Sequence, residues 1–289
     1  MNRASIWIAG ARPRTLVISI TPVLVGTAAA SIDGPTIWWR ALAALVVAVA
    51  LQVGVNYAND YSDGVRGTDR ERRGPLRLTA SGLASPTAVK RAAAIAFTLA
   101  AVVGLVVSIV VSPWLLLVGA AAIAAAVLYT GGPRPYGYEG LGEVSVLVFF
   151  GFVATAGSAF VQLHDIPAVA WWGSLAMGLP ACAILLANNV RDVTTDVEAG
   201  KRTLAVRIGA VNARRLFVAC IAGAFVAVVA VGVSHPLALL GLLAIPFALG
   251  PCRLVLTRAD PPGLVAALVA TTRLQLVLGV LLTVGLALS

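Results

Sequence analysis

Long apolar runs without charge are the feature that most constrains how this chain can fold. Several stretches of about 17–23 residues carry no charged side chain, enough to cross the hydrocarbon core of a bilayer as an α-helix. Their apolar residues do not alternate with polar ones, which argues against the strands of a membrane barrel. Only 11% of the residues are charged, too few to cover a soluble domain. The sequence therefore predicts an all-α polytopic membrane protein.

We expect about nine spanning segments, organised as one membrane domain over residues 1–289. The predicted segments are 15–32, 38–58, 92–111, 114–130, 144–162, 168–190, 216–234, 237–257 and 263–287.

Basic residues gather on one side of this predicted bundle. Of the 21 Lys and Arg residues, 19 fall at the N-terminus or in the connections that follow the even-numbered segments. Only Arg40 falls on the other side, and Arg273 falls within a span. Because cytoplasmic loops are enriched in Lys and Arg, the N-terminus is expected in the cytoplasm. The net charge of +9 then sets topology and attracts anionic lipid, and it does not argue for nucleic acid.

Two polar motifs close two of the even-numbered spans at their cytoplasmic ends. The first is Asn-Tyr-Ala-Asn-Asp-Tyr-Ser-Asp at 56–63, and the second is Asn-Asn-Val-Arg-Asp-Val-Thr-Thr-Asp at 188–196. Both contain Asn-x-x-x-Asp, and the two copies are 132 residues apart. This pattern predicts two related halves, each of which contributes one acidic edge to a shared site.

Helical spacing places the polar side chains of each motif on one face. At about 100° per residue, Asn56, Asp60 and Asp63 fall within roughly 60° of one another, and the matching residues of the second motif within about 80°. Carboxylates stacked at the end of a membrane helix repel one another unless a cation lies between them. Mg²⁺ takes oxygen ligands, commonly one or two carboxylates plus substrate phosphates. The predicted Mg²⁺ ligands are Asn56, Asp60, Asp63, Asn188, Asp192 and Asp196.

A turn-rich loop at 129–143 is the third polar segment. It offers Tyr129, Arg134, Tyr136, Tyr138 and Glu143 between two apolar segments. The simplest interpretation is an aromatic belt at the membrane interface, which suits Tyr138 better than Tyr129 or Arg134.

Two other interpretations of the acidic motifs stay open at this point. The acids can be ordinary solvated helix ends paired with neighbouring arginines, although the same motif in both halves argues against this. They can also belong to the proton or Na⁺ path of a transporter. Coupling sites lie near the bilayer midplane, however, and no Asp or Glu falls in the middle of a predicted span.

The chain resembles the UbiA-type intramembrane aromatic prenyltransferases over nearly its whole length. The resemblance rests on residues 11–16, 56–63, 74–75, 129–143, 188–196 and 200–209. One position departs from the pattern, because the first motif of the family often reads Asn-x-x-x-Asp-x-x-x-Asp. Gly64 stands at its last position here, so the acid is Asp63, with Asp69 as a possible substitute.

Within the family, the chain most resembles members that act on 1,4-dihydroxy-2-naphthoate in menaquinone synthesis. The resemblance implies a Mg²⁺-dependent enzyme of the bacterial plasma membrane that transfers the polyprenyl group of a polyprenyl diphosphate to this acceptor. CO₂ is lost and demethylmenaquinone forms. A relative with another acceptor, such as 4-hydroxybenzoate or haem, is the alternative. The residues expected at the reaction are Asp60, Asp63, Asp192, Asp196, Tyr129 and Arg134, and those expected to bind substrate are Asn56, Asn188, Arg66, Arg77, Lys201 and Tyr136.

Overall fold

A computed structural model describes residues 2–67 and 76–289, and this part of the chain contains helices and no strands. The elements are α1 (Arg3–Ala11), η1 (Pro13–Thr15), α2 (Val17–Ser31), α3 (Trp38–Arg66), α4 (Pro86–Val110), α5 (Trp114–Leu128), η2 (Tyr136–Glu139), α6 (Gly142–Val146), η3 (Leu147–Val153), α7 (Ala154–Leu163), α8 (Ala168–Glu198), α9 (Leu204–Ser234), η4 (Pro236–Ala244), α10 (Ile245–Thr257) and α11 (Pro261–Ala287).

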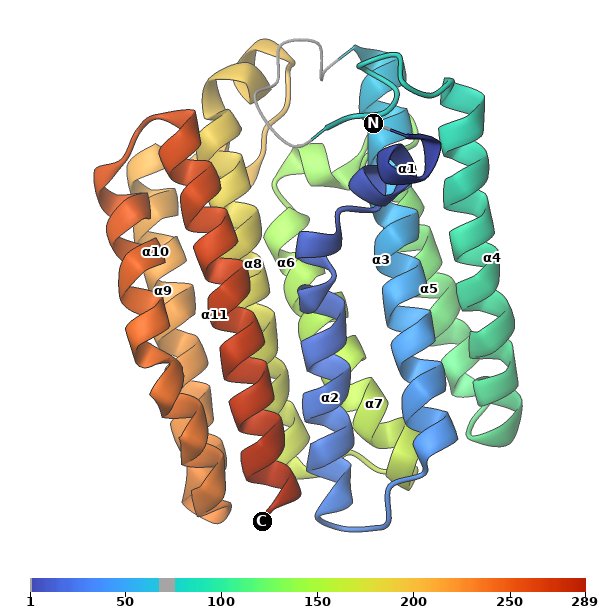
Figure 1. Ribbon diagram of the computed structural model, residues 1–289, viewed down its shortest axis with the longest axis vertical. Coiled ribbons are helices and arrows are strands. Elements are labelled where there is room, and N and C mark those ends of the chain that lie inside the picture. The colour runs from blue at the N-terminus through green and yellow to red at the C-terminus, as the bar shows by residue number, and fades with distance from the viewer. Residues whose placement is uncertain (1, 68–75) are drawn as a thin grey trace.

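Each of the nine predicted spans corresponds to a helical segment of the bundle (Figure 1). Within the described residues, seven helices are long and apolar enough to cross a membrane. The segment up to Thr15 and α2 make an eighth if they are joined across their 51° bend, and α5 is a shorter apolar helix of 15 residues. The all-α membrane fold is confirmed, and nine is an approximate number of spans.

Glycines let the helices approach closely around α8, which is the most buried of the spanning helices. A Cβ on Gly26 of α2 would lie 2.0 Å from the carbonyl oxygen of Thr155 in α7. In the same way, Gly151 of η3 lies against Gly178 of α8, where an added Cβ would meet backbone atoms. Only glycine fits such backbone-to-backbone contacts. The first contact holds α2 against α7, and the second holds η3 against the central helix α8.

The two motifs occupy equivalent places in the two halves. The first motif lies near the end of α3, which packs against α4, and the second lies near the end of α8, which packs against α9. Both motif helices continue well beyond their apolar stretch, to Arg66 and Glu198. The extra turns carry the acidic residues past the apolar part of the bundle.

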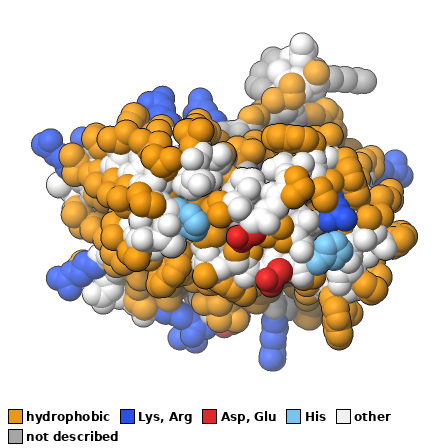
Figure 2. All heavy atoms as spheres, turned by 90° about the horizontal axis from the view of Figure 1, so that it is seen from below, with side chains coloured by type: hydrophobic (Ala, Val, Ile, Leu, Met, Phe, Trp, Pro, Cys, Tyr) orange, Lys and Arg blue, Asp and Glu red, His pale blue; other side chains and the backbone are white. Residues whose placement is uncertain are grey.

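The two ends of the bundle differ in chemistry. The chain begins at the end where the long loops gather and finishes at the opposite end (Figure 1). Figure 2 shows the end where the C-terminus lies, on which hydrophobic and uncharged side chains dominate. Five exposed tryptophans lie in the first turns of α3, α5 and α8: Trp38, Trp39, Trp114, Trp171 and Trp172. Such a ring is typical of a membrane–water interface, and it marks this end of the bundle as one surface of the bilayer.

Candidate functional site

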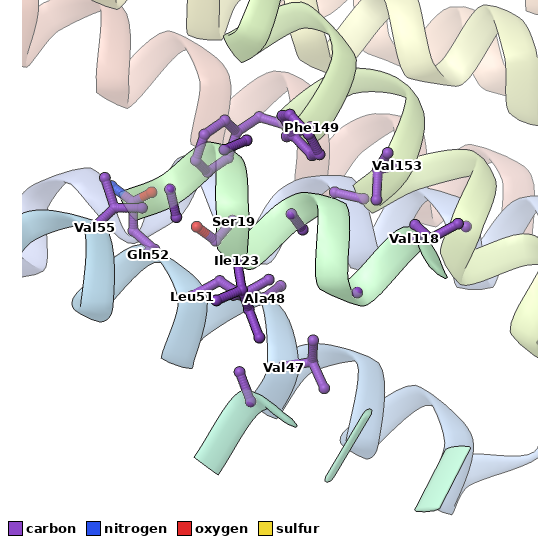
Figure 3. A pocket seen from close by; sticks show the side chains of 18 of the residues that line it. Ser19, Val47, Ala48, Leu51, Gln52, Val55, Val118, Ile123, Phe149 and Val153 are labelled. Atoms are coloured by element: carbon purple, nitrogen blue, oxygen red, sulfur yellow. The ribbon is translucent and has the colours of Figure 1, made fainter. Parts of the chain in front are cut away.

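An apolar cavity of about 500 Å³ lies inside the bundle, between α2, α3, α4, α5, the η3–α7 segment and α8. Its lining on α3 runs from Ala44 to Asn59, a rise of about 22 Å at 1.5 Å per residue. Figure 3 shows mostly apolar side chains on its wall, among them Ile123 and Phe149. One end of the cavity lies toward the loops that are rich in Lys and Arg, and we call it the charged end. Asn56, Asn59 and Asn188 line the cavity there. The cavity therefore has the shape and polarity for a long apolar chain with a polar head.

Asp60 of the first motif holds the segment that follows α3. Its side chain is 1% exposed, and its two carboxylate oxygens accept hydrogen bonds from the backbone N–H groups of Leu78 and Thr79, at 2.7 and 2.8 Å. Asn56, one turn earlier, donates from Nδ2 to the carbonyl oxygen of Ala11 at 2.9 Å, which ties α1 to α3. Both residues therefore shape the charged end of the cavity.

The same segment explains why glycine occupies position 64. A Cβ on Gly64 would lie 2.5 Å from the side chain of Thr79. An aspartate there would displace the backbone that Asp60 holds. Asp63 is buried nearby, whereas Asp69 lies outside the described residues, as do Arg70, Arg72, Arg73, Gly74 and Pro75.

In the second motif, Asp192 forms a buried two-point contact with Arg191 at 2.7 and 2.6 Å. Asp196 lies one turn further on, with Thr203 Oγ1 at 3.5 Å from its carboxylate. The backbone N–H of Lys201 donates to the carbonyl oxygen of Asp196 at 2.7 Å, which fixes the loop after α8. This bond turns the chain so that Lys201 reaches the other motif.

Lys201 joins the two motifs. Its Nζ lies 3.5 Å from the Asp63 carboxylate, and Arg77 Nη2 lies 3.7 Å from the same group. The Tyr138 hydroxyl also donates to Asp63. Lys201 and Arg66 lie over the Tyr138 ring, at 4.5 and 5.6 Å from its centroid, where the ring attracts cations. The interpretation of Tyr138 as a simple interfacial belt residue is wrong, because it lies where both motifs meet.

Four hydrogen bonds hold the 129–141 loop on α3. Thr130 donates to Asn59 at 2.8 Å, Arg66 donates to the carbonyl oxygens of Thr130 and Gly132, and Tyr138 donates to Asp63. Arg66, which the sequence analysis expected to bind substrate, therefore also helps to position this loop.

Tyr129 and Tyr136 line the cavity from this loop, whereas Arg134 does not. The two rings meet edge to face with centroids 5.5 Å apart. The Tyr136 hydroxyl lies 2.8 Å from the Ala125 carbonyl oxygen, to which it donates, and 2.9 Å from Ser145 Oγ. Burial raises the pKa of Tyr136, which keeps it a neutral phenol. Arg134 is exposed and lies outside the cavity lining, so the structure does not bring it to the other predicted residues.

The carboxylates suit a metal that arrives with its substrate. Asp60, Asp63, Asp192 and Asp196 are all buried at the charged end. Among the described residues, however, no three His, Cys, Asp or Glu side chains form a ready metal cluster. An ionised carboxylate has about four lone-pair positions, so Asp60 retains capacity beyond the two backbone N–H groups that it binds. Mg²⁺ typically completes its shell with waters and phosphate oxygens, and this donor set fits that pattern.

The pattern of the UbiA prenyltransferase family matches residues 19–270, most of the chain. The chain belongs to the UbiA prenyltransferase family. It is 49% identical to the 1,4-dihydroxy-2-naphthoate octaprenyltransferase of Mycobacterium tuberculosis over 250 residues, 86% of each chain. It is 37% identical to the Escherichia coli protein of the same name, over 100% of this chain and 97% of that one.

Solved UbiA structures share this fold. A UbiA homologue from Aeropyrum pernix superimposes with a TM-score of 0.69 at 16% identity, over 96% of this chain and 98% of that one. A homologue from Archaeoglobus fulgidus, solved bound to DMAPP and Mg²⁺, gives a TM-score of 0.66 at 14% identity, over 96% and 99%.

Several polar cavity residues of this UbiA chain were not predicted from the sequence, among them Arg12, Ser19 and Gln52. Arg12 was assigned to topology, yet it lines the cavity, and its place in the conspicuous Ala-Arg-Pro-Arg-Thr run is the signal that was available. Ser19 and Gln52 also line it, but each is a single polar residue within an apolar run. No motif marks them.

Proposed function

We propose that this chain transfers a polyprenyl group from a polyprenyl diphosphate to 1,4-dihydroxy-2-naphthoate, with loss of CO₂. The observation that carries the proposal is the apolar cavity whose polar end is formed by both motif helices, since it suits a substrate with an apolar tail and a charged head. Relatives at 37% and 49% identity that carry this activity in their names support the acceptor. The transporter alternative is not favoured in a chain of this family.

The diphosphate would lie at the charged end, with its isoprenoid chain in the cavity. Lys201 and Arg77 converge on Asp63 there. Among the described residues, they are cations well placed to bind phosphate oxygens. Tyr138 holds Lys201 in position through its ring. Fixed cations around the leaving group stabilise the charge that develops on it.

Asp60, Asp63, Asp192 and Asp196, with Asn56 and Asn188, are the residues that would hold Mg²⁺. The bound ion supplies Lewis-acid neutralisation of the departing diphosphate. Structures of a UbiA homologue from Archaeoglobus fulgidus solved with DMAPP or GPP and Mg²⁺ support a role for this ion.

The reaction then requires a site that excludes water, because breaking the C–O bond separates charge. The allylic C–O bond breaks and its electron pair stays on the diphosphate. The ring carbon of the electron-rich acceptor that carries the carboxylate forms the new C–C bond. The acceptor carboxylate leaves as CO₂, its bonding pair returns to the ring, and the quinol form of demethylmenaquinone results. The apolar wall of the cavity keeps water from the allylic centre.

We further propose that the charged end faces the cytoplasm of a bacterial cell and that the protein lies in the plasma membrane. The distribution of Lys and Arg supports this orientation. Polyprenyl diphosphate would then reach its headgroup site from the inner leaflet.

The test is an assay of purified protein with a labelled polyprenyl diphosphate, a panel of aromatic acceptors and Mg²⁺. We expect prenylation of 1,4-dihydroxy-2-naphthoate with release of CO₂, no turnover in excess EDTA, and recovery when Mg²⁺ is restored. Efficient use of 4-hydroxybenzoate in place of the naphthoate would move the chain to another acceptor class. Full activity in EDTA would contradict the metal assignment.

A further inference from the structure

Two polar side chains that have no role in the site so far face the cavity. Gln52 of α3 is 5% exposed and Ser19 of α2 is 1% exposed, and both line the cavity wall (Figure 3). Gln52 Oε1 and Ser19 Oγ have no hydrogen-bond partner within the part of the chain that the structure describes. Buried polar atoms are rarely left so, because an unsatisfied one destabilises the protein. A group that enters the cavity is expected to bind them.

Other buried hydroxyls behave differently. Ser108, Ser158 and Ser174 each donate to the carbonyl oxygen four residues earlier in their helix. Thr27 and Thr155 also have an unpartnered hydroxyl, but neither lines the cavity. Among the described residues, Ser19 and Gln52 are the two uncharged side chains that combine an unpartnered buried atom with a place on the cavity wall.

Gln52 lies at the depth where the two substrates must meet. It precedes Asn56 by one helical turn and Asp60 by two, about 12 Å along the axis of α3. A diphosphate at the level of Asp60 and Asp63 places the first carbons of its chain below Asn56, toward Gln52. The acceptor ring must reach the first of these carbons.

The hydrogen-bonding capacity of the two unpartnered atoms indicates which chemical groups the ligand carries. A glutamine Oε1 only accepts hydrogen bonds, whereas a serine hydroxyl both donates and accepts. An isoprenoid tail offers neither, and a diphosphate or carboxylate oxygen cannot donate to Gln52. A hydroxyl satisfies both residues, and it satisfies the amide of Gln52 in either orientation. The matching ligand is an aromatic ring that carries hydroxyl groups.

We propose that Gln52 and Ser19 bind the hydroxyl groups of the aromatic acceptor, so that they set both which ring is used and where it lies. This inference rests on the proposed function, from which the acceptor comes. The two residues make no bond in the reaction. They are specificity-determining contacts on adjacent helices, α2 and α3, which pack together.

Gln52→Met and Ser19→Ala, measured separately as purified proteins, test the proposal. Each should raise KM for 1,4-dihydroxy-2-naphthoate about tenfold, the scale of one lost hydrogen bond that is partly desolvated. KM for the polyprenyl diphosphate should not change. The melting temperature should stay the same or rise, because each change removes an unsatisfied buried atom. A merely structural role predicts the reverse, lower stability with unchanged acceptor KM.

Matched controls are Gln275→Met and Ser174→Ala. Both residues are fully buried outside the cavity, and their side chains donate to the carbonyl oxygens of Met177 and Ala170. Gln275 Oε1, like Gln52 Oε1, has no hydrogen-bond partner within the described residues, but Gln275 does not line the cavity. Both variants should keep wild-type KM for both substrates, and Ser174→Ala should lose stability.

A second measurement uses 1-hydroxy-2-naphthoate, which lacks one hydroxyl, as a competitive inhibitor. The wild-type protein should favour the dihydroxy ring, and at least one variant should bind the two rings with nearly equal strength. Active wild-type protein together with unchanged acceptor KM and unchanged ring preference in both variants would overturn this inference alone. Failure of the wild type to prenylate any hydroxylated aromatic ring would overturn the proposed function as well.

Discussion

The four motif aspartates have different surroundings, and this changes what their substitution should do. The Asp60 carboxylate accepts hydrogen bonds from two backbone N–H groups, and the Asp192 carboxylate pairs with a buried arginine. Replacing either acid leaves buried donors without an acceptor, which costs about 1–3 kcal/mol for each neutral group and more for a charge. Loss of stability in these variants therefore does not distinguish an ion-pair role from a metal-binding role. The acid and its ion-pair partner have to be substituted separately and their turnover compared.

Asp192→Asn and Arg191→Gln provide that comparison. If Asp192 only pairs with Arg191, the two variants should have similar turnover. If Asp192 holds Mg²⁺, Asp192→Asn should lower single-turnover prenyl transfer roughly a hundredfold or more, the scale of losing one preorganised electrostatic partner, and Arg191→Gln far less. Asp33→Asn, an exposed residue at the opposite end, should be nearly silent. Equal losses of turnover in Asp192→Asn and Arg191→Gln would mean that Asp192 only forms an ordinary ion pair.

Residue-level prediction from sequence succeeded on helices and was weaker in loops. The spacing of Asn56, Asp60 and Asp63 follows from helical geometry, and the structure buries all three at one end. In the 129–141 loop no periodicity exists, so residue type alone favoured Arg134 over Tyr138. The fold reverses this order, because Tyr138 lies between Lys201 and Arg66.

The spans could be predicted because burial in lipid requires long uncharged helices, which leave a direct trace in the sequence. The exact helix ends could not. The predicted spans ended at residues 58 and 190 and the helical motifs continued them to 63 and 196, whereas α3 and α8 end at Arg66 and Glu198. Backbone hydrogen bonding does not stop where hydropathy falls. The π-helical turn of η3 was also invisible, since one extra residue in a turn hardly changes an apolar run.

Two glycines on the cavity wall lead to a prediction about the length of the polyprenyl donor that the cavity accepts. Gly119 of α5 and Gly157 of α7 line the cavity, and a Cβ on either would meet open space. Gly119→Leu should fill part of the deep cavity, about 15 Å along α5 from Tyr129. We expect kcat/KM for a long polyprenyl diphosphate to fall roughly tenfold or more, by overpacking, and that for geranyl diphosphate to change little.

Gly250→Leu is the matched control for this experiment. Gly250 is an exposed helical glycine of α10 with the same open surroundings, and it lies outside the cavity lining. Both substitutions should favour helix formation by a similar amount, so a difference in donor preference reports the cavity. Equal activity of Gly119→Leu with short and long donors would mean that the tail does not pass α5.

At the scale of the whole molecule, the two related halves account for a shared site that has no preformed metal cluster among the described residues. Each half delivers one acidic motif at the end of a long helix. Lys201, which follows the second motif, contacts Asp63 of the first, and Tyr138 donates to the same carboxylate. Sequence symmetry predicted two facing edges, but it could not show that a lysine and a tyrosine would join them. This arrangement pairs the carboxylates with groups of the protein. Under the proposed function, a substrate with its bound metal would exchange those partners.

The orientation of the whole molecule gives the last prediction. The loops that carry most of the Lys and Arg residues lie at the end where the chain begins, and the exposed tryptophans lie at the other. By the positive-inside rule the first end faces the cytoplasm. Ser85 and Thr194 are exposed at this end, and Asp165 is exposed between α7 and α8 at the other. In a variant without Cys182, Cys220 and Cys252, a single cysteine at 165 should react with an impermeant thiol reagent added to intact cells. Cysteines at 85 and 194 should react only after the membrane is opened, and labelling of 85 and 194 in intact cells with 165 protected would reverse the orientation.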